Sequence, residues 1–105
     1  MLKMSFIFIY ITAPNKREAR KIAEAVITNK LAGCANFFPM TSIYRWKGKL
    51  HHGSEVILIL KTIAGKAPLV KKVIEKMHPF ETPCITLIPV KPNQKYARWL
   101  QEQVK

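Results

Sequence analysis

The amino-acid sequence predicts one α+β domain spanning residues 1–105, with strands and helices in the order βαββαβ and a further short helix at the C-terminus. Three observations lead to this fold class. Four runs are rich in aromatic and β-branched residues, as strands are. Two stretches between these runs repeat apolar residues at steps of three and four, as amphipathic helices do. Proline, glycine and asparagine separate the runs, and a chain of this length can bury a core without disulfides or metals.

The first strand is expected at Ser5–Thr12, where nearly every residue is aromatic or β-branched, and Ala13-Pro14 stops it. A helix is expected from about Asn15 to Leu31. Asn15 is suited to the N-cap, and Glu18 three residues later completes a variant of the capping box. The apolar face of this helix consists of Ala19, Ile22, Ala23, Val26 and Ile27.

A long hairpin is expected to follow. The extended run from Cys34 to Trp46 is predicted to lie at an edge and to bend at Pro39, because proline has no N–H for the hydrogen-bond ladder. Lys47-Gly48-Lys49 supplies the turn. The return strand runs to about Ile63, with an irregularity expected at His51-His52-Gly53.

The last third of the chain is predicted to form a helix, a strand and a short helix. Pro68 suits the first turn of the second helix, and His78-Pro79 ends it. A strand is expected from Thr82 to Val90, and Pro92-Asn93 precedes the terminal helix. The buried stripe of the second helix is Leu69, Val70, Val73, Ile74 and Met77, and the terminal helix carries Tyr96, Trp99 and Leu100.

The strands themselves predict an oligomer. Right-handed crossovers place both main helices on one face of a four-stranded antiparallel sheet, so a monomer would need polar residues on the other face. Burying each large aliphatic side chain there would gain about 1.5–3 kcal/mol, and a second copy of the chain is the simplest cover. The two apolar sets are Phe6, Phe8, Tyr10 and Ile7, Ile9, Ile11 in the first strand, and Val56, Leu58, Leu60 and Ile57, Ile59 in the third.

The composition limits the function classes. There are 18 basic residues, six glutamates and no aspartate, which give a net charge of +12. The lysines are spread over every predicted element, which favours a solubilising surface over a nucleic-acid-binding patch. No run approaches the roughly 20 apolar residues of a membrane-spanning helix.

The two cysteines, Cys34 and Cys84, form no CxxC pair and are too few for a disulfide framework. We expect them to be free, to be buried as small hydrophobic residues, and to indicate the reducing cytoplasm. The apolar run Met4–Ile11 after Lys3 is similar to the core of a signal peptide, but its aromatic and β-branched residues and the charged helix after it favour a strand.

Five blocks of sequence carry a family resemblance: Ala32-Gly33-Cys34-Ala35-Asn36, Thr41–Lys49, Ser54-Glu55-Val56 through Leu60-Lys61-Thr62, His78-Pro79-Phe80-Glu81-Thr82-Pro83, and Tyr96–Leu100. Together they resemble the CutA family of divalent-cation tolerance proteins over nearly the whole chain. The resemblance implies a ferredoxin-like fold similar to that of PII signalling proteins. It also implies a homotrimer in which strands pair across subunits, copper binding in some members, and no established reaction.

His78 is the first candidate metal ligand, because copper(II) prefers imidazole supported by thiolate, thioether or carboxylate. In the resemblance it lies in the block used for copper-site assignments, three residues before Glu81. The alternative is that His78 only caps the preceding helix. The bacterial pattern has a cysteine and a second histidine where this chain has Ile11 and Met77, so the resemblance predicts a weak site.

Met77 and Cys84 complete the candidate ligand set. Met77 could serve copper(I) as a thioether, with core packing as its alternative role. Cys84 stands where the family commonly has an acidic residue, and it could pair with His78 on a metal. His51 and His52 are interpreted as incidental surface histidines, because neighbours on a strand point to opposite faces.

Five further residues are candidates for a pocket or interface. Glu55, Lys61 and Glu81 are polar residues in apolar surroundings, and they could line a pocket between subunits or form interface ion pairs. Tyr44 and Trp46 share one strand face, with Trp99 expected nearby, and packing is favoured over ligand stacking.

Three other functions are alternatives to metal-responsive binding. RRM domains share the βαββαβ order, but the third strand lacks their glycine and aromatic signature, so nucleic acid is disfavoured. An enzyme is disfavoured because no nucleophile elbow, P-loop or aspartate is present. A PII-like regulator that binds a small anion between subunits stays open. Together with the resemblance, the sequence therefore predicts a trimeric, metal-responsive, non-enzymatic protein to which no cofactor is assigned and which binds copper or another divalent cation weakly.

Overall fold

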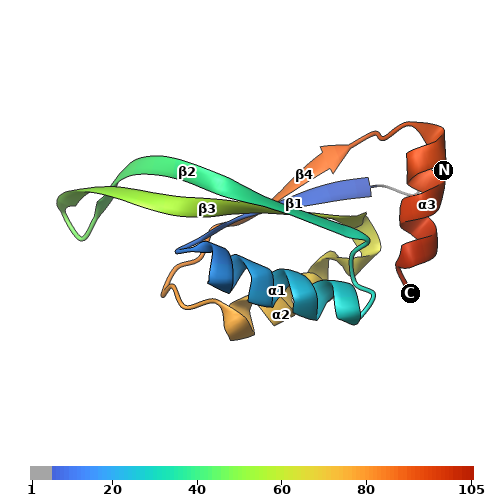
Figure 1. Cartoon of the computed structure of the whole chain (residues 1–105), viewed down its shortest axis with the longest axis horizontal. Helices are drawn as coiled ribbons and strands as arrows, with labels where there is room; N and C mark the ends of the chain where they lie inside the picture. Colours follow the sequence, from blue (N-terminus) through green and yellow to red (C-terminus); the bar gives the residue numbers. More distant parts are fainter. Residues whose placement is uncertain (1–5) are drawn as a thin grey trace.

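The computed structural model describes residues 6–105, which form one four-stranded antiparallel sheet in the order β2-β3-β1-β4. Helices α1 and α2 both lie against one face of the sheet, and α3 lies at its end (Figure 1). This arrangement confirms the predicted fold class. The elements are β1 (Phe6–Ala13), α1 (Lys16–Thr28), β2 (Cys34–Trp46), β3 (Lys49–Ile63), the 3-10 turn Ala64–Lys66, α2 (Ala67–Met77), β4 (Ile85–Val90) and α3 (Gln94–Gln103).

The first strand and helix differ from the prediction mainly at their ends. Of the residues expected in the strand, Ser5 lies outside the described part of the chain, as does Met4 of the apolar run. The predicted N-cap is confirmed, because Asn15 Oδ1 accepts a hydrogen bond from the Glu18 N–H at 2.9 Å. The helix ends at Thr28 and not at Leu31, since Lys30 adopts a left-handed conformation with a φ of 58°.

The hairpin has a two-residue turn in which Lys47 and Gly48 take φ values of 51° and 79°, the conformation that matches the twist of paired strands. The two strands pair without a shift from Cys34 opposite Lys61 to Trp46 opposite Lys49. The irregularity expected at 51–53 is therefore wrong. Pro39 lies in the edge strand β2, as predicted, and the register with β3 continues through it opposite Val56.

The last strand begins at Ile85, so the prediction of a strand from Thr82 is wrong at that end. The ladder between β1 and β4 stops at the pair Ile11 and Ile85. The carbonyl of the next residue, Thr12, accepts a hydrogen bond from the His78 ring instead of from β4. Segment 82–84 is thereby left as a loop that can turn toward the hairpin.

The core lies between the sheet and the two main helices. The buried polar side chains among residues 6–105 are Thr62 and His78, and Thr62 Oγ1 donates to the Leu31 carbonyl at 2.6 Å. Within the same described range, no helix has the length and apolar character needed to cross a bilayer. The buried hydrophobic cluster consists of Ile7, Ile9, Ile11, Ala13, Ala19, Ile22, Ala23, Val26, Ala32, Val56, Leu58, Leu60, Val70 and Ile74.

The opposite side of the sheet carries a second apolar set, which among residues 6–105 is approached by α3 at one end only. In β1, Ile7, Ile9 and Ile11 are buried under the helices, whereas the alternate residues stay partly exposed. Helix α3 lies at one end of the sheet and leaves the rest of this side bare (Figure 1). We call this surface the open face; by strand alternation and register it consists of Phe6, Phe8, Tyr10, Phe38, Met40, Ile57, Ile59, Ile63, Ile88 and Val90.

Candidate functional site

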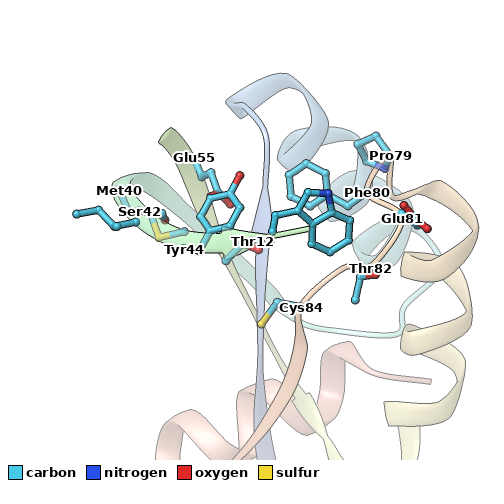
Figure 2. A pocket seen from close by; sticks show the side chains of 12 residues that line it. Thr12, Met40, Ser42, Tyr44, Glu55, Pro79, Phe80, Glu81, Thr82 and Cys84 are labelled. Carbon is cyan, nitrogen blue, oxygen red and sulfur yellow. The ribbon is translucent and has the colours of Figure 1, made fainter. Parts of the chain in front are cut away.

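A cleft of about 560 Å³ lies between the hairpin and the segment that joins α2 to β4 (Figure 2). We call it the hairpin cleft. Its lining brings together most of the residues that the sequence singled out as site or ligand candidates, because segment 79–84 turns toward the hairpin. These residues are Tyr44, Trp46, Glu55, Glu81 and Cys84, joined by Thr12, Met40, Ser42, Ile43, Pro79, Phe80 and Thr82.

The hairpin supplies the aromatic side of the cleft. Tyr44 and Trp46 alternate along β2, which places them on the same face, as predicted. Tyr44 stacks on His51 from β3, with ring centroids 5.5 Å apart and planes 13° apart. Tyr44 remains 45% exposed and Trp46 38% exposed, so both rings are open to a ligand or a partner.

Trp99 does not join these rings, and the expectation that it lies near Tyr44 and Trp46 is wrong. Its ring packs on Tyr96 of the same helix, with centroids 5.5 Å apart. Tyr96 lies beside Lys61, which pairs with Cys34 at the far end of the hairpin. Ten residues of strand, or about 33 Å, separate Cys34 from Tyr44.

Lys61 is likewise remote from the cleft, although it shares a strand with Glu55. Six residues of strand separate the two, about 20 Å. The Lys61 ammonium lies 5.3 Å from the ring centroid of Phe8 and 5.7 Å from that of Tyr96. Partial burial, and next the neighbouring Cys34 thiol, raise the pKa of the Tyr96 phenol. Because Lys61 contacts Phe8 of β1 and Tyr96 of α3, it links the terminal helix to the sheet.

Removing this cation is expected to loosen α3. The Lys61→Ala variant should lose about 1–2 kcal/mol of unfolding free energy, because two cation–π contacts disappear. Lys61→Arg, which keeps a cation over the rings, should lose much less. Urea unfolding at equal protein concentration measures both. Equal stability of wild type and Lys61→Ala would contradict this role.

His78 is 8% exposed and uses both ring nitrogens inside the protein. Nε2 lies 2.6 Å from the Thr12 carbonyl oxygen, and Nδ1 accepts a hydrogen bond from the Phe80 N–H at 3.1 Å. These partners assign the hydrogen to Nε2, because a backbone N–H needs a lone pair on Nδ1. A metal could bind His78 only by displacing one of them. His78 is the C-cap residue of α2, and its backbone N–H donates to the Ile74 carbonyl at 2.8 Å, but its ring faces the Thr12 carbonyl of β1.

The two sulfur candidates have different surroundings. Met77 packs against the hydrophobic core, as its alternative role predicted. Cys84 is exposed and Cys34 half-buried, so the expectation that both cysteines are buried is wrong. Cys84 lies in the loop before β4, on the cleft wall, with Sγ 3.5 Å from Thr86 Oγ1. Residues 6–105 contain no group of three His, Cys, Asp or Glu side chains arranged to hold a metal.

The charged side chains that line the hairpin cleft are Glu55 and Glu81. Lys47 reaches Glu81 from the hairpin turn, with Nζ 4.0 Å from Oε1 and 5.7 Å from the centroid of the Trp46 ring. Sequence reasoning assigned Lys47 only to the turn and missed this role. No local signal could have found it, because Lys47 and Glu81 meet only when segment 79–84 folds against the hairpin.

A family model described as CutA1 divalent ion tolerance protein matches residues 7–103. The chain is also similar to the divalent-cation tolerance protein CutA of Archaeoglobus fulgidus, at 40% identity over 99 residues that cover 93% of this chain and 97% of that protein. The corresponding protein of Thermus thermophilus is 38% identical over 96 residues, 90% and 93% of the two chains. Human protein CutA is 37% identical over 95 residues, but the match spans only 53% of that protein.

Solved structures agree with these sequence similarities. The periplasmic divalent cation tolerance protein CutA from Archaeoglobus fulgidus superposes with a TM-score of 0.92 at 39% identity, covering 95% of this chain and 99% of that one. CutA1 from Oryza sativa superposes with a TM-score of 0.91 at 32% identity, covering 96% and 94%. The similarity therefore extends over the sheet, the helices and the segments that line the cleft.

Proposed function

The chain belongs to the CutA1 family of divalent ion tolerance proteins. From this premise we propose that it acts as a homotrimer. We also propose that it responds to divalent cations by binding the metal ion directly and weakly. The observation that carries the proposal is the family match over residues 7–103 of a 105-residue chain. We treat these residues as one domain. Its role is binding and not catalysis.

The open face supports the homotrimer. It contains ten apolar or aromatic side chains on the side of the sheet opposite α1 and α2, and their burial by a neighbouring copy would be strongly favourable. Within residues 6–105, β2 pairs only with β3 and β4 only with β1, so each has one unpaired edge. An edge strand is a template for pairing with another copy, and a cyclic arrangement closes the assembly.

The proposed metal contact uses the candidate set Cys84, His78 and Met77. Cys84 leads it, because its thiol is exposed at the cleft. His78 would have to give up the Phe80 N–H, and Met77 would have to leave its core contacts. Both rearrangements cost free energy, so the contact should be weak for copper or any other divalent cation.

The remaining alternatives receive less support. A small anion, as expected of a PII-like regulator, would meet Glu55 and Glu81 in the hairpin cleft. Nucleic acid is disfavoured because an RRM carries its glycine and aromatic signature on the third strand, where this chain has Ile57 and Ile59. Catalysis by Cys84 lacks a base, since its hydrogen-bond partner is the Thr86 hydroxyl. Two free cysteines are consistent with a reducing cytoplasm, which we propose as the location.

A zinc(II) titration followed by calorimetry tests the metal contact, because zinc is divalent and does not oxidise thiols. Wild type is expected to bind weakly, and Cys84→Ser should weaken binding by more than the roughly tenfold that loss of an outer-shell partner costs. Cys34→Ser, which removes the other free thiol, should bind like wild type. Absence of binding by wild type would refute direct metal contact, and equal affinity of wild type and Cys84→Ser would remove Cys84 from the site.

A further inference from the structure

We propose that the hairpin cleft is a binding site for organic polyammonium cations, and that Lys47 of the same chain competes with them for the site. The proposal does not depend on the metal contact. The cleft lies at the hairpin end of the same sheet side as the open face, with Met40 common to both, so the site is tested in the assembled protein. The proposal follows from the aromatic walls of the cleft, the sign of its charges and the position of the Lys47 ammonium.

The walls of the cleft suit a cation. Tyr44 and Trp46 come from the hairpin, and Phe80 comes from the loop after α2. Aromatic ring faces carry negative potential and attract ammonium groups, most strongly where the cation is partly desolvated. A cleft of about 560 Å³ is within the size range of small-molecule sites.

The charge of the lining is unusual for this protein. The chain has 18 basic residues and six glutamates, yet two of those glutamates line the hairpin cleft, and within residues 6–105 no lysine, arginine or histidine does. Figure 2 shows Glu55, with Tyr44 beside it, and Glu81 on opposite sides of the cleft, with Phe80 between them. A ligand with an ammonium group at each end can meet both carboxylates, which favours a polyamine over a monoamine.

Lys47 marks where a cation binds. Its ammonium lies beside Glu81 and over the Trp46 ring, the same two groups that a ligand would use. The side chains of Lys47 and Glu81 are 73% and 75% exposed, so solvent screens their ion pair and a ligand can displace Lys47 at little cost. Removing Lys47 should therefore improve binding, an effect that a purely structural ion pair would not produce.

The net charge of +12 opposes the approach of any cation from a distance. Salt at about 0.15 M screens charges beyond roughly 8 Å, so contacts inside the cleft decide the affinity under those conditions. Measurements should accordingly be made at that ionic strength and not in dilute buffer.

The test is a calorimetric titration of the full-length, assembled protein with spermidine, a flexible polyamine, and with butylamine, which has one ammonium group. We expect spermidine to bind more tightly than butylamine. Lys47→Gln should strengthen spermidine binding by about threefold or more, and Glu81→Gln should weaken it by about fivefold, the scale of one exposed ion pair.

Two matched variants separate the cleft from general electrostatics. Lys72→Gln and Glu75→Gln make the same charge changes on α2, outside the cleft, and should leave spermidine affinity unchanged. Absence of binding by both wild type and Lys47→Gln would overturn the proposal. Equal effects of Lys72→Gln and Lys47→Gln would also overturn it, because net charge alone would then account for the result. Sedimentation of each variant keeps a change of assembly from being mistaken for a change of affinity.

Discussion

Replacing Ile59 by glutamate is expected to abolish the assembly. Ile59 lies in β3 on the open face, opposite Tyr10 of β1 and Asn36 of β2. In the proposed homotrimer each copy would bury a carboxylate without a partner, which costs several kcal/mol per subunit, and would lose about 1.5–3 kcal/mol of apolar burial. These losses are repeated in every subunit, so the trimer should give way to monomers or aggregates.

Sedimentation velocity or light scattering at micromolar concentration measures the result. Leu69→Glu is the matched control. The prediction that Leu69 belongs to the buried stripe of α2 is wrong, because its side chain is 47% exposed, and α2 lies on the other side of the sheet. That variant should assemble like wild type. A monomeric wild type, or an Ile59→Glu variant that still assembles, would contradict the proposed use of the open face.

Replacing His78 by alanine is expected to have the second largest effect, a loss of about 2–4 kcal/mol of unfolding free energy. The Thr12 carbonyl and the Phe80 N–H would both lose their partner in a mostly buried setting, at a cost of about 1–3 kcal/mol each. The His78 ring would also lose its contact with Phe80, whose ring centroid is 4.8 Å away.

Two further variants make this measurement specific. The unfolding free energy of His78→Asn should fall between those of wild type and His78→Ala. The asparagine oxygen can accept a hydrogen bond from the Phe80 N–H, but the side chain is too short to reach the Thr12 carbonyl. His52→Ala removes an exposed histidine and should change stability by less than about 0.5 kcal/mol. Chemical unfolding at fixed protein concentration provides the comparison, since assembly makes stability concentration-dependent. A loss below 0.5 kcal/mol in His78→Ala would show that these hydrogen bonds do not stabilise the fold.

Some features of the site could be predicted from residues alone. Tyr44 and Trp46 are two positions apart in a strand. Their common face follows from the two-residue alternation of side chains along a strand. The helix end at His78 follows from Pro79, which disfavours helical conformation in the residue before it. The hairpin turn follows from Gly48, which accepts the left-handed conformation without strain.

Other features depended on contacts that local patterns do not encode. Strand β4 is shorter than predicted. The ladder between β1 and β4 ends at Ile11 and Ile85, because the carbonyl of the next residue, Thr12, bonds the ring of His78, 66 residues away in sequence. Cys84 was expected to be buried, but the resulting loop exposes it. Lys61 was grouped with Glu55 by residue type, although strand geometry alone already separates them by about 20 Å.

The sequence by itself therefore determined the order of the elements, the two apolar faces of the sheet and the capping of α1 by Asn15. These depend on spacing within a few residues, which propensity and periodicity report directly. Only the tertiary structure decided that Lys47 meets Glu81 and that both His78 nitrogens are occupied. Such contacts join segments that are distant in sequence, and their energy depends on how the helices and loops pack once the sheet has formed.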